Sequence, residues 1–198
     1  MISKRLFDLL ASSCGLLFLA PLLLVLAIWI KLDSPGTVFF RQERVGRAGK
    51  LFHIHKFRTM ATDAELVGLP LTVGNDVRIT TVGRWLRKYK LDELPQLIDV
   101  WQGHMSLVGP RPEVPRYVEL YPADVRKLVL SVRPGITDQA SIEFRDENEL
   151  LGHTPDPELA YVNEVLPIKL RYYVDYVNSR TFFGDVKLIV KTLISLIR

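Results

Sequence analysis

The stretch LLASSCGLLFLAPLLLVLAIWI, residues 9–30, contains no charged side chain and decides how this chain is organised. At about 1.5 Å rise per residue, a helix of this length matches the roughly 30 Å hydrocarbon core of a bilayer. The residues at its end, Trp29 to Asp33, offer no small-residue cleavage site. We therefore expect a retained membrane segment rather than a cleaved signal peptide.

Two features bear on how this segment meets the membrane. Pro21 lies near its middle, where a proline removes a helical hydrogen bond and kinks the helix. Basic residues flank both ends: Lys4 and Arg5 before it, and Lys31, Arg41, Arg44, Arg47 and Lys50 after it. Both flanks thus resemble a cytoplasmic side. A helix bent at Pro21 that enters and leaves by one face and a single-pass anchor with a tolerated proline both remain open.

Composition and charge narrow the class of protein. The chain has 198 residues, 48% of them hydrophobic, which excludes a disordered chain. Cys14 is its only cysteine, so neither a disulfide framework nor a cysteine zinc site can form, and a reducing, cytosolic compartment is expected. The net charge of +4 divides into +1 for residues 1–30, +7 for residues 31–90 and −4 for residues 91–198. The basic excess therefore lies next to the apolar segment.

The rest of the chain predicts short strands and helices. Residues 37–40 and 51–55 indicate a hairpin around a basic connection, and residues 61–80 indicate a loop with at most a short helix. His53 and His55 share a strand face, and without a third ligand we favour a structural role over a metal pair. The expected fold is α+β and mostly helical, with a membrane helix over residues 1–32 and a cytosolic or interfacial domain over residues 33–198.

Two further helices are expected beside the membrane. Gly83 to Lys90 gathers Arg84, Arg87 and Lys88 beside aromatic residues, which favours contact with anionic lipid headgroups over binding of nucleic acid. Residues 186–198 form an apolar helix that is too short to span a bilayer. For this second helix, packing on the domain core and lying in the membrane interface are both open.

Asp92 and Glu93 are the strongest candidates for chemistry. A proline is tolerated only in a helix's first turn, so Pro95 predicts a helix that begins close to Leu91, with both carboxylates at its positive end. Such a pair beside arginines can hold a divalent cation that faces a phosphate. Acidic residues also favour first helical turns without any function, so the pair alone proves little.

Arginines held by proline turns strengthen this interpretation. Arg111 stands between Pro110 and Pro112, which fixes the direction of a side chain suited to bidentate phosphate binding. Arg133 precedes a Pro-Gly turn in the same way. With Arg87, these residues predict a cationic cradle around the two carboxylates.

Spaced motifs over nearly the whole chain resemble one known family. They are Lys56-Phe57-Arg58-Thr59-Met60, Leu91-Asp92-Glu93-Leu94-Pro95-Gln96, Met105-Ser106-Leu107-Val108-Gly109-Pro110-Arg111-Pro112, Val132-Arg133-Pro134-Gly135-Ile136-Thr137 and Asp185-Val186-Lys187. In this order, after an apolar segment with a central proline, they resemble the small monotopic, PglC-like phosphoglycosyl transferases among the bacterial sugar transferases.

The resemblance implies transfer of a sugar 1-phosphate from a UDP-sugar to polyprenyl (undecaprenyl) phosphate with release of UMP. This is the first membrane step of surface glycan biosynthesis, on the cytoplasmic face of the bacterial inner membrane. It further implies that Asp92 is a nucleophile that forms a covalent phosphosugar-aspartyl intermediate and that Glu93 helps it to hold Mg2+. The expected phosphate-binding residues are Lys56, Arg58, Arg87, Arg111 and Arg133.

Two of the chain's departures from the family pattern concern the membrane segment and the turn before the nucleophile. Ala20 precedes Pro21 where the family usually has serine, although re-entry of the helix is still favoured. Lys90 stands where serine or threonine usually caps the turn before the nucleophile.

A non-catalytic module that recruits partners to the membrane surface is the alternative function, but it gives no reason for two carboxylates among the arginines. No nucleic acid partner is expected, because the second half is acidic and the anchor apolar. The sequence determines neither the UDP-sugar nor the oligomeric state, so a homodimer remains open.

Overall fold

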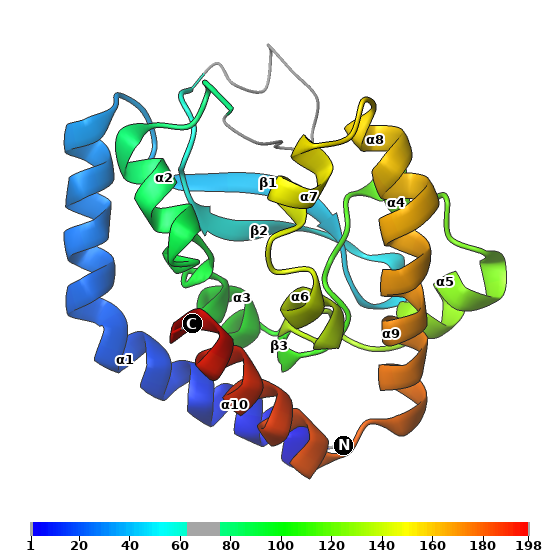
Figure 1. Ribbon diagram of the computed structural model, residues 1–198. Helices are drawn as coiled ribbons and strands as arrows, with labels where there is room; N and C mark the ends of the chain where they lie inside the picture. Colours follow the sequence, from blue (N-terminus) through cyan, green and yellow to red (C-terminus); the bar gives the residue numbers. More distant parts are fainter. Residues whose placement is uncertain (1, 63–75, 198) are drawn as a thin grey trace.

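The fold is mostly helical, with two small sheets, in a computed structural model that describes residues 2–62 and 76–197 (Figure 1). The α-helices are α1 (Ile2–Asp33), α2 (Thr81–Lys88), α3 (Gln96–Gln102), α4 (Pro115–Val118), α5 (Ala123–Val129), α6 (Gln139–Glu143), α7 (Glu147–Gly152), α8 (Pro157–Ala160), α9 (Leu166–Ser179) and α10 (Phe182–Ile197). The strands are β1 (Phe39–Val45), β2 (Leu51–Phe57), β3 (Ser106–Val108) and β4 (Gly135–Thr137). The expected mostly helical α+β class is confirmed.

The apolar segment forms helix α1, which continues through Pro21. Figure 1 shows that α1 is bent along its length into two arms. Among the described residues, Ser3–Asp33 is the one helix long and apolar enough to cross a membrane, with a mean hydropathy of 2.5. Only 11% of its most apolar window is buried inside the protein, so most of this surface is free to contact lipid. These properties are consistent with membrane association.

The amino-terminal arm of α1 is bound to the domain by polar contacts. Lys4 forms an ion pair with Asp185 at the start of α10. Asp8, which is buried, accepts hydrogen bonds from Ser106 Oγ (2.9 Å) and from the backbone N–H of Leu107 (3.1 Å) in β3. Figure 1 accordingly places the N-terminus beside the beginning of α10.

The other end of α1 is held by apolar packing. Leu26 and Ile30 are buried in one cluster with Phe57 of β2 and with Val82 and Leu86 of α2. Helix α2, which confirms the helical turn expected over residues 83–90, is capped by Thr80, whose Oγ1 accepts a hydrogen bond from the Gly83 N–H (3.0 Å). Both ends of the long apolar helix therefore contact the same domain.

Strands β1 and β2 form the expected antiparallel hairpin, which is longer than predicted. Phe39 pairs with Phe57, and pairing continues to Val45 opposite Leu51, so that only residues 46–50 make the turn. Ala48 adopts a left-handed conformation there, with a φ of 59°. Arg41 and Arg44, which were expected in the connection, instead lie on β1 because the paired backbone continues through them, whereas Arg47 and Lys50 lie in the turn as expected.

Strands β3 and β4 form a parallel pair at the centre of the domain. Helix α10 packs against this pair and against α6, and it begins four residues earlier than expected. It leaves Phe183 and Val190 exposed. Both surroundings considered for this helix are thus compatible with the fold. Of the predicted loop over residues 61–80, residues 63–75 lie outside the described residues.

Candidate active site

A cavity of about 550 Å³ lies between the hairpin, the segments that carry Asp92 and Arg111, and helices α6 and α10. Asp92, Glu93, Lys56, Arg87 and Arg111 all line it. The structure therefore brings together five of the seven residues that the sequence singled out. Apolar side chains from several elements also line the cavity, among them Phe40 of β1, Leu97 of α3 and Ile189 of α10.

The two carboxylates lie in a 3-10 turn, Leu91–Glu93, that precedes helix α3. The α-helix starts at Gln96, not close to Leu91 as the sequence predicted. Pro95 explains the difference: it has no N–H to donate to the Leu91 carbonyl, which accepts the tighter bond from the Leu94 N–H instead (3.3 Å). The short turn points both carboxylates at the cavity.

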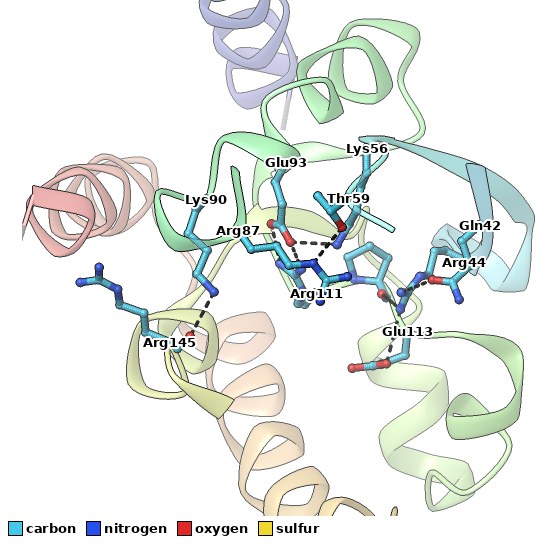
Figure 2. A network of polar contacts seen from close by, with 11 residues as sticks. Gln42, Arg44, Lys56, Thr59, Arg87, Lys90, Glu93, Arg111, Glu113 and Arg145 are labelled. Atoms are coloured by element: carbon cyan, nitrogen blue, oxygen red, sulfur yellow. Dashed lines mark hydrogen bonds and ion pairs between the residues drawn. The ribbon is translucent and has the colours of Figure 1, made fainter. Parts of the chain in front are cut away.

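Glu93 is held by two cations from distant elements. Lys56 Nζ of β2 donates to Glu93 Oε1 (2.9 Å), and both terminal nitrogens of Arg111 donate to the same carboxylate, one of them to Oε2 at 3.0 Å (Figure 2). Burial alone would raise the pKa of Glu93, but Arg111 and Lys56 hold it well below its ordinary value. Glu93 is therefore a fixed negative charge.

Asp92 is treated differently from its neighbour. It is 9% exposed, and its carboxylate accepts no hydrogen bond from any residue that the structure describes. Burial, and then the charge of Glu93, raise the pKa of Asp92 above its ordinary value, although Lys56, Arg87 and Lys90 act in the opposite direction. A buried carboxylate without hydrogen bonds retains free lone pairs for a metal ion or for attack on phosphorus.

Arg111 reaches the site because two loops approach each other closely. A Cβ on Gly135 would lie 2.1 Å from the backbone nitrogen of Gly109, so both positions need glycine. The N–H of Arg111 donates to Asp138 Oδ2 (2.9 Å), which fixes the backbone that carries the guanidinium. The sequence predicted that the loop around Arg111 fixes the direction of its side chain, and this geometry agrees with that prediction.

The other predicted arginines lie in different places. Arg87 lines the cavity, and its Nε donates to Thr59 Oγ1 (2.8 Å). Arg58 does not line the cavity and donates to backbone carbonyls just after α1, including that of Ser34 (2.7 Å). Arg133 donates to the Gly103 carbonyl (2.8 Å) and does not line the cavity. The structure thus gives Arg58 and Arg133 contacts that stabilise the fold around the site.

Several cavity residues were missed by sequence reasoning. Glu113 accepts a hydrogen bond from Tyr161 Oη (2.7 Å) and lies 3.7 Å from Arg44. Lys169 forms an ion pair with Glu147, and its Nζ lies 4.9 Å from the centre of the Tyr161 ring. These residues come from separate parts of the chain, so spacing gives no signal for them. Glu113 is the exception, because it lies only two residues after Arg111 in the sequence.

The cavity has an excess of positive charge. Among the described residues, seven lysines and arginines line it against four aspartates and glutamates. Glu93, Glu113 and Glu147 each lie in an ion pair. An anionic ligand would compensate the cations that remain.

The carboxylates of the cavity suit a metal ion only if a bound ligand supplies further oxygen atoms. No group of three or more His, Cys, Asp or Glu side chains in the described part of the chain is placed to hold a metal ion. Mg2+ is commonly held by one or two carboxylates together with waters and substrate phosphates. The free lone pairs of Asp92, next to Glu93, fit such a site.

His55 has a structural partner, as the sequence suggested. Both oxygens of the fully buried Asp99 accept hydrogen bonds from it, Oδ2 from the backbone N–H (2.8 Å) and Oδ1 from the ring Nδ1 (2.7 Å). His53 is exposed. The contact joins β2, which carries Lys56, to α3, which follows Glu93.

The fold and the cavity together describe a membrane-associated protein with a cationic site built around two carboxylates. Comparison with known families agrees with this class of protein and identifies one family within it. The chain belongs to the bacterial sugar transferase family, which it matches over residues 1–198. The expected family is therefore confirmed.

Three relatives illustrate the family. The exopolysaccharide production protein PSS of Rhizobium leguminosarum bv. phaseoli is 38% identical, over 98% of this chain and 95% of its own length. A UDP-N-acetylgalactosamine-undecaprenyl-phosphate N-acetylgalactosaminephosphotransferase of Aeromonas hydrophila is 35% identical over 96% of this chain, and a UDP-glucose:undecaprenyl-phosphate glucose-1-phosphate transferase of Klebsiella pneumoniae is 36% identical over 98%. This chain spans only 42% and 40% of the length of these last two proteins.

Proposed function

We propose that this protein transfers a sugar 1-phosphate from a UDP-sugar to polyprenyl (undecaprenyl) phosphate and releases UMP. The observation that carries the proposal is Asp92, a buried carboxylate that accepts no hydrogen bond from the described residues, beside cations in a cavity of about 550 Å³. Family membership and the names of the relatives support the same reaction. Those names specify different sugars, so the sugar stays open.

The reaction we propose has two displacements at one phosphorus atom. An oxygen of Asp92 bonds to the phosphorus that carries the sugar, the bond from that phosphorus to the bridging oxygen breaks, and UMP leaves with that oxygen. An oxygen of polyprenyl phosphate then bonds to the same phosphorus, and the carboxylate of Asp92 is released. The product is a polyprenyl diphosphate sugar.

The surrounding residues would reduce the repulsion between an anionic nucleophile and an anionic substrate. Arg87 has no carboxylate within ion-pair distance among the described residues and would bind a phosphate oxygen directly. Lys56 and Arg111 hold Glu93 and would contribute positive potential from beside it. Mg2+ held by Asp92 and Glu93 would supply Lewis-acid stabilisation of the phosphate charge.

We further propose that α1 is re-entrant and that the domain lies on the cytoplasmic face of the bacterial inner membrane. The support is that both arms of α1 contact one domain, through Lys4 and Asp8 at one end and through Ile30 at the other. A straight span would place its two ends on opposite sides of the bilayer. Pro21 and the basic residues on both flanks agree with a bent helix.

Release of UMP tests the reaction. With a UDP-sugar panel, polyprenyl phosphate and Mg2+, wild type should release UMP, and Asp92→Asn should lower the rate at least about a thousandfold because Asn cannot serve as the nucleophile. Glu93→Gln should impair the rate less, because it leaves the nucleophile in place. A phosphosugar adduct on Asp92, detected by mass spectrometry before the lipid is added, would identify the intermediate.

Asp124→Asn provides the matched control, since Asp124 is an exposed aspartate of α5 outside the cavity. This variant should keep wild-type turnover. Full turnover by Asp92→Asn would eliminate the covalent mechanism. Membrane binding without UMP release from any UDP-sugar would instead favour the recruitment module.

A further inference from the structure

The cations that line the cavity fall into two sets. Lys56 and Arg111 are paired with Glu93, Arg44 lies near Glu113, and Lys169 pairs with Glu147. In the described part of the chain, Arg87, Lys90 and Arg145 have no carboxylate within ion-pair distance. Arg87 lies beside Thr59 on the side of Lys56, whereas Lys90 and Arg145 lie together on the other side (Figure 2).

Lys90 is held next to the nucleophile by an unusual backbone. Its φ of 54° and ψ of 24° place it in the left-handed region, directly before the turn that carries Asp92. This backbone conformation is less favourable for lysine than for glycine or asparagine. Its Nζ donates to the backbone carbonyl of Arg145 (3.1 Å), a neutral acceptor that leaves the positive charge uncompensated.

Arg145 contacts both Lys90 and helix α10. Its guanidinium donates to the backbone carbonyl of Ser195, so the side chain lies against α10. The same helix contributes the apolar residues Ile189 and Leu193 to the cavity. Lys90 and Arg145 both line the cavity beside this apolar surface, which suits a phosphate attached to a hydrocarbon chain, and their charges equally suit a nucleotide phosphate.

The proposed reaction requires a place for two different phosphates in succession. In a displacement at phosphorus, the attacking and leaving oxygens lie roughly in line. UMP must therefore leave on the side opposite the Asp92 oxygen, and the lipid phosphate must attack from that same side. One cationic subsite can serve both, provided that it is not already occupied by a carboxylate.

We propose that Lys90, together with Arg145, forms this second phosphate subsite, which holds the phosphate of departing UMP and then the phosphate of incoming polyprenyl phosphate. The inference rests on the proposed function. Lys90 exchanges its hydrogen bond to the Arg145 carbonyl for one to a phosphate oxygen. It is a binding residue, and the displacement itself is carried out by Asp92.

Lys90→Asn tests the subsite because asparagine tolerates the left-handed backbone but carries no charge. Loss of one charge-assisted hydrogen bond should lower kcat/KM about tenfold to a hundredfold, both for the UDP-sugar and for polyprenyl phosphate. Lys90→Arg keeps the charge and should restore both values to within about threefold of wild type. Binding of UMP alone, measured by calorimetry, should weaken in Lys90→Asn by a similar factor.

Lys127→Asn is the control, because Lys127 is an exposed lysine of α5 and its loss changes the net charge equally. It should leave both kcat/KM values unchanged. The inference is overturned if Lys90→Asn matches wild type, or if only one of the two kcat/KM values falls. A wild type that releases no UMP from any UDP-sugar would be a separate result, which overturns the proposed function and this inference with it.

Discussion

Asp92 and Glu93 are adjacent in sequence, yet the protein treats their charges in opposite ways. Glu93 receives hydrogen bonds from Lys56 and Arg111, and its pKa lies well below the ordinary value. Burial raises the pKa of Asp92, whose carboxylate accepts no hydrogen bond from the described residues. Opposite shifts in neighbouring carboxylates are typical of sites that give them separate tasks. Here Glu93 stays charged and fixed, while Asp92 keeps its lone pairs free of hydrogen bonds from the described residues.

The raised pKa of Asp92 predicts that its charge destabilises the folded state. The folded protein binds the Asp92 proton more tightly than the unfolded chain, so this cost is present above the raised pKa and vanishes as the pH falls through it. Asp92→Asn should therefore raise Tm at pH 7 by about 2–4 °C, the shift for roughly 1 kcal/mol in a chain of this size.

Thermal unfolding of both proteins in one detergent, over a series of pH values, provides the measurement. The gain in Tm should shrink as the pH falls, because wild-type Asp92 then becomes neutral as well. An asparagine variant that is less stable than wild type at pH 7 would contradict the prediction.

The cavity residues that the sequence singled out lie inside compact motifs. Asp92, Glu93 and Arg111 were found because their neighbours restrict the local backbone. Arg58 and Arg133 share such motifs, but their side chains bond to nearby backbone carbonyls. Lys90 was noticed only as a missing helix cap, since its contact with Arg145 crosses 55 residues of sequence. Contacts of this kind depend on the folded chain and leave no local pattern.

Among the elements, β2 and α3 are joined by a buried polar contact. Asp99 is 0% exposed and accepts two hydrogen bonds from His55. Arg41 of β1 donates to the other ring nitrogen of His55, so both nitrogens of the ring have partners. Because Lys56 follows His55, this contact also sets the position of the cation that holds Glu93. The sequence placed His53 and His55 on one strand face and did not indicate which of the two is buried.

Asp99→Ala should destabilise the protein by about 2–4 kcal/mol, because it leaves two buried donors of His55 without acceptors. Asp124→Ala, at an exposed position of α5, should change the stability by no more than about 0.5 kcal/mol. Chemical denaturation in detergent, followed by tryptophan fluorescence, compares the two variants. Equal stability of Asp99→Ala and Asp124→Ala would show that the His55 contact contributes nothing.

The predicted helices and strands were of the right type, but their first and last residues were predicted less accurately. The hairpin, α2 and α10 were expected, yet β1 runs to Val45 and α10 begins at Phe182. Strand ends follow from pairing with a partner strand, which a local pattern does not contain. The start of α3 was misplaced because the carbonyl of Leu91 finds its donor one residue earlier than an α-helix requires.

On the scale of the whole molecule, α1 is both an apolar helix long enough to cross a membrane and a structural part of the domain. Its amino-terminal arm meets β3 and α10, and its other end meets β2 and α2. Figure 1 shows its two arms along two sides of the molecule. The sequence left the choice between a bent and a spanning helix open, because charges on the flanks say nothing about contacts between them.

A re-entrant α1 predicts that residue 3 and the domain lie on the same side of the membrane. Ser3 and Ser131 are both exposed, and Cys14 is the only native cysteine. In a Cys14→Ser background, Ser3→Cys and Ser131→Cys should both resist an impermeant maleimide in intact cells and react after permeabilisation. Labelling of Ser3→Cys alone in intact cells would establish a spanning helix.

The ion pair between Lys4 and Asp185 also has a consequence for biosynthesis. The ribosome makes Asp185 181 residues after Lys4, which takes about 10–40 s at ordinary rates of synthesis. During that interval the amino-terminal arm of α1 is without its ion-pair partner. A nascent chain that stalls before α10 can therefore form the contacts of Asp8 with β3 but lacks the ion pair that joins Lys4 to α10.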